Sequence, residues 1–183
     1  MQTVKSLLRV QRLSLTLPRP VVLVPTMGAL HEGHLALVDR AKKLAGRHGS
    51  TVASIFVNPT QFGPREDYQK YPRPFSRDSL LLREKGCDVV FAPTAAEMYM
   101  SDASAVVTES QLTTVMCGLS RPGHFNAVCT VVAKLFHLVQ PNLAIFGEKD
   151  FRLERGIHYF GLHAVVQETK SAWRIPTFLE LVD

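Results

Sequence analysis

The chain has 183 residues, of which 46% are hydrophobic and 20% are charged, and its formal net charge is +5. This length suits one domain with a sizeable core. Lysines and arginines are spread along the chain without a run of five like charges, which argues against a nucleic-acid partner because such interfaces usually carry a clustered basic stripe. Three widely spaced cysteines (Cys87, Cys117 and Cys129) argue against a disulfide framework or a zinc ribbon and favour a reducing compartment.

The N-terminal segment contains short apolar pieces that are interrupted by Arg9, Arg12 and Arg19. A secretory signal or a membrane span needs a longer unbroken apolar run. We therefore expect a cytoplasmic protein with no membrane partner.

Apolar strand-like runs alternate with helical patterns along the chain. Buried strands are predicted at 21–24, 51–57, 88–92 and 143–146, with a weaker strand at 103–108. Helices are predicted at 35–44, 76–85 and 126–140. This alternation predicts an α/β fold in which a mostly parallel sheet carries helices on both faces.

Three polar segments directly follow predicted strands, at 25–34, 58–61 and 147–150. Ligands of parallel sheets bind at the carboxyl ends of the strands. The three segments are therefore expected to lie at the same edge and to form a site.

The turn from Gly28 to His34 (GALHEGH) allows four interpretations. It has P-loop spacing, but His34 and Leu35 replace the lysine and the Ser/Thr that contact phosphate and magnesium. As a metal site the turn is incomplete, because its two histidines lack the H-E-x-x-H spacing and no third ligand is obvious. A third interpretation is purely structural, with both histidines packed in the core. A phosphate site fits the physics best, because a helix N-terminus offers free N–H groups, Gly33 permits close approach and imidazoles can donate to phosphate oxygens.

The H-x-G-H pattern after a strand resembles the signature of the adenylating nucleotidyltransferase superfamily. Taken with it, several further motifs resemble the pantoate–β-alanine ligase (pantothenate synthetase) family, in order from about Val22 to Phe151. These motifs are 25-PTMGALHEGH-34, 55-IFVNPTQF-62, 71-YPR-73, 121-RPGHF-125 and 147-GEKD-150. The resemblance implies a Rossmann-like parallel sheet and a homodimer.

The resemblance also implies a reaction, in which ATP activates pantoate as pantoyl adenylate and the amine of β-alanine then displaces AMP to give pantothenate. It implies Mg²⁺ as the companion of ATP, His34 as the catalytic histidine, His31 beside it on the phosphates, and Lys149 as a point charge on phosphate. The implied ATP site consists of Pro25, Thr26, Met27, Gly28, Ala29, Leu30, His31, Glu32, Gly33, His34, Gly147, Glu148, Lys149 and Asp150.

The resemblance assigns pantoate and β-alanine to Gln61, with Met27 and Asn58 in the same pocket, and it places Asp78 close to the magnesium–ATP complex. Each of these residues also has a purely structural interpretation. Gln61 could be a solvated loop residue, Asn58 part of an Asn-Pro turn, and Asp78 a carboxylate on a helix face. Residues 147–150 could equally form a surface turn.

The sequence departs from the family pattern after Phe151. Leu153 stands where the resemblance places a second pantoate-binding glutamine, and no Ser-Ser-Arg-Asn segment occurs in the chain. We therefore expect a nucleotide- and pantoate-binding domain at 1–151 and a divergent tail at 152–183, with a candidate strand at 162–167 and the family's C-terminal lid domain absent.

Two classes of function follow from these expectations. The chain is either a pantoate–β-alanine ligase, or a catalytically impaired remnant that binds ATP or pantoate, or dimerises, without turnover. A more distant alternative is another adenylyl-transferring enzyme of the same fold, against which the motifs around Gln61 and Arg121 argue.

Overall fold

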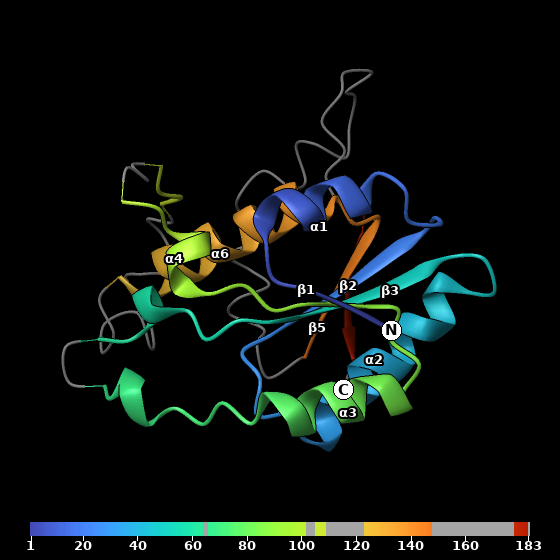
Figure 1. The fold of residues 1–183 in the computed structure, drawn as a ribbon, viewed down its shortest axis with the longest axis horizontal. Coiled ribbons are helices and arrows are strands. Elements are labelled where there is room, and N and C mark those ends of the chain that lie inside the picture. The colour runs from blue at the N-terminus through green and yellow to red at the C-terminus, as the bar shows by residue number, and fades with distance from the viewer. Residues whose placement is uncertain (64–65, 102–104, 109–122, 148–177, 183) are drawn as a thin grey trace.

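The structure is a computed structural model, and it describes residues 1–63, 66–101, 105–108, 123–147 and 178–182. Within these residues the strands form one six-stranded sheet in the order β1-β4-β3-β2-β5-β6, and every neighbouring pair is parallel (Figure 1). The strands are β1 (Gln2–Val4), β2 (Val21–Thr26), β3 (Ser50–Ile55), β4 (Val89–Phe91), β5 (Leu143–Gly147) and β6 (Phe178–Val182). The central strand β2 pairs with β3 along its whole length and with β5 at Val22 and Leu23.

Helices cover both faces of the sheet. The helices are α1 (Leu7–Ser14), α2 (Glu32–Ala45), α3 (Phe75–Glu84), α4 (Ala95–Met98) and α6 (His124–Val139), with short 3₁₀ turns η1 (Pro59–Gln61) and η2 (Tyr68–Lys70). Figure 1 shows α1, α4 and α6 on one side of the sheet and α2 and α3 on the other. The described part of the chain is therefore a three-layer α/β fold, as the sequence predicted.

The two apolar cores follow from the alternation of side chains along each strand. In β4, Val89 and Phe91 point into the core beneath α1 and α6, whereas Val90 points into the core beneath α2 and α3. Strands buried on both faces need apolar residues at consecutive positions. The run Val21–Val24, whose members have no exposed surface, meets this requirement at the centre of the sheet.

The structure confirms the four predicted buried strands and the three predicted helices, with shifts of up to three residues at their ends. The N-terminal elements β1 and α1 were not predicted. Helix α6 begins at His124, two residues before the predicted start, with Gly123 as its N-cap in the left-handed conformation (φ +80°). A glycine adopts this conformation without strain, which moves the helix start two residues upstream.

The weaker strand predicted at 103–108 is not found where it can be checked. Residues 105–108 form no strand, and 103–104 lie outside the described residues. The N–H of Val107 donates to the Thr130 hydroxyl on α6 at 2.9 Å, so this segment is bonded to a helix and not to a strand.

The predicted strand at 162–167 lies outside the described residues, and the domain boundary at 151 stays a prediction. Strand β6 adds to the sheet beside β5, with Leu143 opposite Phe178. Among the helices of the described residues, none is long and apolar enough to cross a membrane.

Candidate functional site

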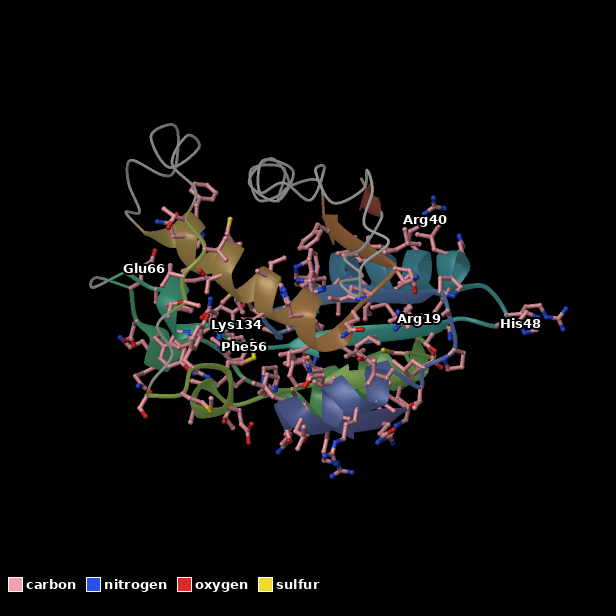
Figure 2. The ribbon with its side chains drawn as sticks, turned by 90° about the horizontal axis from the view of Figure 1, so that it is seen from above. Arg19, Arg40, His48, Phe56, Glu66 and Lys134 are labelled. Atoms are coloured by element: carbon pink, nitrogen blue, oxygen red, sulfur yellow. The ribbon has the colours of Figure 1, made fainter. Side chains whose placement is uncertain are left out.

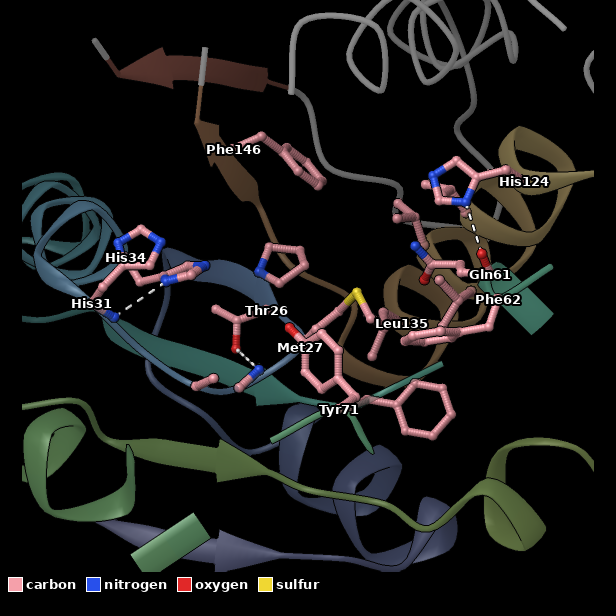
Figure 3. Close-up of a pocket in the computed structure, with 17 residues that line it drawn as sticks. Thr26, Met27, His31, His34, Gln61, Phe62, Tyr71, His124, Leu135 and Phe146 are labelled. Atoms are coloured by element: carbon pink, nitrogen blue, oxygen red, sulfur yellow. Dashed lines mark hydrogen bonds between the residues drawn. The ribbon is translucent and has the colours of Figure 1, made fainter. Parts of the chain in front are cut away.

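A cavity of about 510 Å³ opens at the carboxyl ends of the central strands (Figure 3). Thr26 at the end of β2 and Phe146 near the end of β5 line it, together with the apolar side of α6. Figure 3 shows His31 and His34 on one side of the cavity and Gln61 and His124 on the other. The structure thus brings together two of the three polar segments that the sequence placed at one sheet edge.

The turn between β2 and α2 has an unusual backbone. Gly28 and Ala29 both have positive φ angles, of +80° and +51°. The Gly28 N–H donates to the Thr26 hydroxyl at 3.2 Å, and that hydroxyl donates to the Ser54 carbonyl at 2.6 Å. Leu30, which is 1% exposed, anchors the turn in the core below α2.

Asp78, in the first turn of α3, holds this turn from below. Its Oδ2 accepts the Ala29 N–H at 2.8 Å and its Oδ1 accepts the Leu30 N–H at 2.9 Å, and the residue has no exposed surface. The partial positive charge at the start of α3 also favours a carboxylate there.

These contacts do not fit the predicted role of Asp78 as a magnesium ligand. Both carboxylate oxygens already bind backbone N–H groups, and the buried side chain offers no surface to a hydrated ion. The described residues also contain no group of three or more His, Cys, Asp or Glu side chains that could hold a metal. In the structure Asp78 contacts the backbone of the turn, and its place beside the magnesium–ATP complex stays a prediction.

His31 and His34 cap the N-terminus of α2 reciprocally. His31 Nδ1 accepts the Gly33 N–H at 3.1 Å, and His34 Nδ1 accepts the His31 N–H at 3.4 Å. A side chain on Gly33 would stand 3.0 Å from Cε1 of the His31 ring, so the glycine leaves space for this cap. Gly33 was predicted to let a ligand approach the backbone, and in the structure its missing side chain makes room for the His31 ring.

The capping bonds define which ring nitrogen carries hydrogen. A nitrogen that accepts an N–H is unprotonated, so in each neutral imidazole Nε2 is the donor. Both histidines line the cavity, and their ring centroids are 4.1 Å apart. Two N–H donors at a helix N-terminus form an arrangement suited to phosphate oxygens.

Asn58 lies beneath the opposite side of the cavity and has no exposed surface. Its Oδ1 accepts from the Thr60 N–H, the Thr60 hydroxyl and the Tyr99 hydroxyl at 3.3, 2.8 and 2.9 Å. Its Nδ2 donates to the Ala127 carbonyl of α6 at 3.3 Å. Asn58 does not line the cavity, so the expectation of a substrate-binding Asn58 is not supported, and its contacts instead fix the loop that carries Gln61.

Gln61 lines the cavity, as predicted, and a histidine holds its backbone. His124 Nδ1 lies 2.9 Å from the Gln61 carbonyl oxygen. A carbonyl can only accept, so Nδ1 of His124 carries the hydrogen. His124 was not predicted as a site residue, although the motif 121-RPGHF-125 that contains it was recognised.

An aromatic wall that sequence reasoning missed closes the cavity beside Gln61. Phe62 packs edge-on against Tyr68 and Tyr71, and Phe62 and Tyr71 both line the cavity. The Arg73 guanidinium donates to the carbonyls of Tyr68, Gln69 and Tyr71 and stacks 4.5 Å from the Tyr68 ring. The motif 71-YPR-73 was the available signal for this wall.

The buried carboxylate of Asp78 also affects the pKa of Tyr71 in this wall. Burial raises the pKa of the Tyr71 phenol, the negative charge of Asp78 raises it further, and Arg73 offsets part of the effect. Tyr71 therefore stays a neutral hydrogen-bonding group at the cavity.

Among the residues predicted for the site, some line the cavity, some do not, and some lie outside the described residues. Leu30 is buried beneath the turn, and Glu32, Gly33 and Gly147 do not line the cavity. Glu148, Lys149 and Asp150 lie outside the described residues. The predicted residues that do line the cavity are Pro25, Thr26, Met27, Gly28, Ala29, His31, His34 and Gln61.

A parallel sheet whose central strand leads into a histidine-capped helix defines the class of this domain. It is a nucleotidyltransferase-like α/β domain. A family model described as pantoate-beta-alanine ligase matches residues 1–159. The chain belongs to the pantoate–β-alanine ligase family.

Individual relatives agree with this assignment. The chain is 58% identical over 132 residues to the pantothenate synthetase of Akkermansia muciniphila, a match that covers 72% of this chain and 47% of the relative. It is 52% identical over 148 residues to the pantothenate synthetase of a Thermoanaerobacter species, covering 80% of this chain and 50% of the relative. The chain thus spans about half the length of the curated relatives it matches.

Solved structures show the same fold. The crystal structure of pantothenate synthetase from Thermus thermophilus matches with a TM-score of 0.85 at 43% identity, covering 100% of this chain and 61% of that one. The pantoate-beta-alanine ligase from Francisella tularensis, complexed with beta-gamma ATP and beta-alanine, matches with a TM-score of 0.85 at 30% identity, covering 100% and 67%.

Proposed function

We propose that this chain carries the nucleotide- and pantoate-binding site of an enzyme that condenses pantoate with β-alanine at the expense of ATP. In the first step a pantoate carboxylate oxygen attacks the α-phosphorus of ATP and pyrophosphate leaves. In the second step the amine of β-alanine attacks the activated carbonyl carbon and AMP leaves. Family membership supports the reaction class, and the cavity at the carboxyl ends of β2, β3 and β5 supports its location.

The observation that carries this proposal is the pair of histidine donors at the start of α2, facing the same cavity as the Gln61 amide. Negative charge grows on the α-phosphate as the carboxylate attacks, and donors already fixed at that place stabilise the transition state more than the ground state. We assign His34 to the reacting phosphate and His31 to a neighbouring phosphate. Lys149 remains the proposed cationic contact to phosphate, beside the two neutral imidazole donors.

The opposite side of the cavity suits pantoate. The Gln61 amide can accept from a hydroxyl and donate to a carboxylate oxygen, a combination that an anionic side chain could not offer without repelling the substrate. Val128, Val131 and Leu135 of α6 provide an apolar wall for the methyl groups of pantoate or for adenine. Met27 also lines the cavity and lies between its two sides in Figure 3.

Magnesium is proposed to reach the site with the phosphates of ATP. This ion keeps several waters and often binds through substrate phosphates with few protein ligands. The contacts of Asp78 with the turn agree with this mode of binding.

A second candidate function is ATP binding without turnover. Leu153 stands where the resemblance places the second pantoate-binding glutamine. Loss of positioning groups around the reacting centre can cost orders of magnitude in rate while leaving contacts to the nucleotide intact. We propose that this chain binds ATP weakly and forms little pantothenate.

The test combines titration calorimetry with ATP and with pantoate and an assay of pantoate-dependent ATP–pyrophosphate exchange. ATP binding without exchange would support the second candidate. Exchange at rates comparable with a full-length relative assayed in parallel would remove it and support the ligase. A chain that binds neither ligand would contradict both proposals.

We also propose that the chain forms a homodimer, as the family resemblance implies. Sedimentation equilibrium at micromolar concentration should give twice the chain mass. A monomer at every concentration tested would contradict the proposal.

A further inference from the structure

The turn that shapes the nucleotide side of the cavity adopts a conformation that its own sequence disfavours. Ala29 has a φ of +51°, in the left-handed region that residues with a Cβ atom rarely occupy. The backbone from Met27 to Ala29 lines the cavity, and the histidine cap follows two residues later. Something outside the turn must therefore hold Ala29 in place.

The carboxylate of Asp78 is placed to do so. Its two oxygens accept the N–H groups of Ala29 and Leu30, which are consecutive residues of the turn. The turn also packs directly on the carboxylate, because a Cβ atom on Gly28 would stand 3.1 Å from Asp78 Oδ2. Two acceptor oxygens directed at two consecutive N–H groups define the local backbone direction.

We propose that Asp78 is a positioning residue that locks the left-handed Gly28–Ala29 turn in its ATP-binding shape and does not itself contact metal or substrate. The lock is a property of the unliganded chain. Its consequence for ATP affinity rests on the proposed function.

An amide in place of the carboxylate tests the lock with almost no change of volume. Asparagine has one acceptor oxygen, so Asp78→Asn leaves one of the two N–H groups facing an NH₂ group. An unpaired N–H disfavours the locked conformation. We expect the turn to leave the left-handed region in a large fraction of molecules.

The chain offers a matched control at the other end of the sheet. Asp88 Oδ2 accepts the Thr51 N–H at 2.8 Å and the Lys42 ammonium at 3.2 Å, and Asp88 does not line the cavity at the carboxyl edge. Asp88→Asn also replaces a carboxylate that accepts a backbone N–H by an amide. It therefore reports the loss of such a contact away from the turn.

The first measurement is amide hydrogen exchange of the unliganded chain by NMR. In wild type the N–H groups of Ala29 and Leu30 should be protected, and Asp78→Asn should speed their exchange by about tenfold or more, while Asp88→Asn leaves them unchanged. Wild-type protection of both N–H groups in Asp78→Asn would overturn the lock.

The second measurement is ATP affinity by calorimetry, at a temperature well below the melting midpoints of all variants. We expect Asp78→Asn to weaken ATP binding about tenfold and Asp88→Asn to leave it unchanged. The loss should be the same with and without Mg²⁺. A loss that is confined to Mg²⁺-containing buffer would restore the metal-ligand role and overturn the proposal.

The third measurement couples the carboxylate to the strained residue. Glycine adopts positive φ freely, so Ala29→Gly removes the backbone strain that the two hydrogen bonds of Asp78 otherwise have to offset. The effect of Asp78→Asn on ATP affinity should therefore be several-fold smaller in the Ala29→Gly background than in wild type. Equal losses in both backgrounds would show that Asp78 acts by another route.

A further variant keeps the proposal testable if Asp78→Asn does not fold. Ala29→Val disfavours the left-handed conformation while leaving the carboxylate in place, and it should also weaken ATP binding. Unchanged affinity in Ala29→Val would contradict the proposal. If the wild-type chain binds no ATP, the proposed function fails for this chain, whereas the lock is still decided by the exchange rates.

Discussion

The two ends of the sheet use the same residue types to different effect. At the carboxyl end, Asp78 binds loop backbone, Asn58 binds the backbone of Thr60 and of Ala127 in α6, and neither has exposed surface. At the amino end, Asp88 and Asn142 also bind strand backbone, but each shares its oxygen with a basic side chain, Lys42 or Arg19.

This difference agrees with the proposed placement of the anion site at the carboxyl end. At the amino end the acceptors already use the nearby cations, and the Arg19 guanidinium donates to backbone carbonyls as well. At the carboxyl end the buried acceptors use backbone N–H groups, while imidazole donors border the cavity. Figure 2 shows the two ends, with Arg19 and His48 toward one and Phe56 and Glu66 toward the other.

The largest effect is expected from removing a histidine at the carboxyl end. In a form of the enzyme that turns over, His34→Ala should lower kcat about a thousandfold with a much smaller change in the KM for ATP. The matched control is His48→Ala. His48 is exposed in the loop before β3, so this substitution should leave both constants unchanged. Steady-state kinetics decide the point, and a normal kcat with a raised KM would argue against a catalytic His34.

The next largest effect is expected on the free energy of unfolding, from a close-packed glycine at the amino end. A Cβ atom on Gly49 would lie 2.3 Å from the Ala45 carbonyl oxygen and 2.4 Å from that of Pro20. Gly49→Ala should therefore reduce the free energy of unfolding by about 3 kcal/mol. Gly63→Ala, which has no atom within 4 Å of the added Cβ, should change it by less than about 1 kcal/mol in urea titration.

Cys87 provides a third test at the amino end. Burial raises the pKa of its thiol to about 11, although backbone hydrogen bonds partly oppose the shift. Near pH 8 the thiolate fraction should then be about a hundredfold lower than in an ordinary cysteine, and alkylation followed by mass spectrometry should be slow by that factor. The urea-unfolded chain is the control, and equally fast alkylation when folded would show that the thiol is accessible.

The same shift has a consequence for stability. Because the pKa is raised on folding, the folded state favours the neutral thiol, and its contribution is fully present below pH 9. It should be lost as the pH rises from about 9 to about 11. Cys87→Ser should weaken this dependence of the melting temperature on pH.

The smallest effects are expected on the unfolding free energy when the asparagine at each end of the sheet is replaced. Asn58→Asp should cost about 2 kcal/mol of unfolding free energy, since a buried carboxylate would face the Ala127 carbonyl in place of an N–H donor. Asn142→Asp keeps the acceptor for Val21 and places its charge beside Arg19, so we expect a change within about 0.5 kcal/mol. Equal losses in thermal melts of the two variants would mean that the two ends are built alike.

The sequence predicted the sheet and helices well because long apolar runs with clear periods carry that information. It missed β1, whose three residues are too few to show a period, and α1, whose apolar pieces were interpreted as interrupted. It located His31, His34 and Gln61 through motifs. It could not assign Asp78 or Asn58, because their partners lie 49 and 69 residues away in the chain and the same residue types serve as ligands elsewhere.

The position of β2 between β3 and β5 has a consequence for the chain as it is synthesised. Strands β1 to β4 can associate once Phe91 has emerged, but the far side of β2 then remains an unpaired edge until β5 arrives. The Val21 N–H waits for an acceptor on Asn142, 121 residues later. An apolar strand with an open edge invites association with other chains. The nascent protein is therefore most prone to aggregation between these two events. Helix α6, which is synthesised within this interval and directly before β5, is also the helix that lines the cavity.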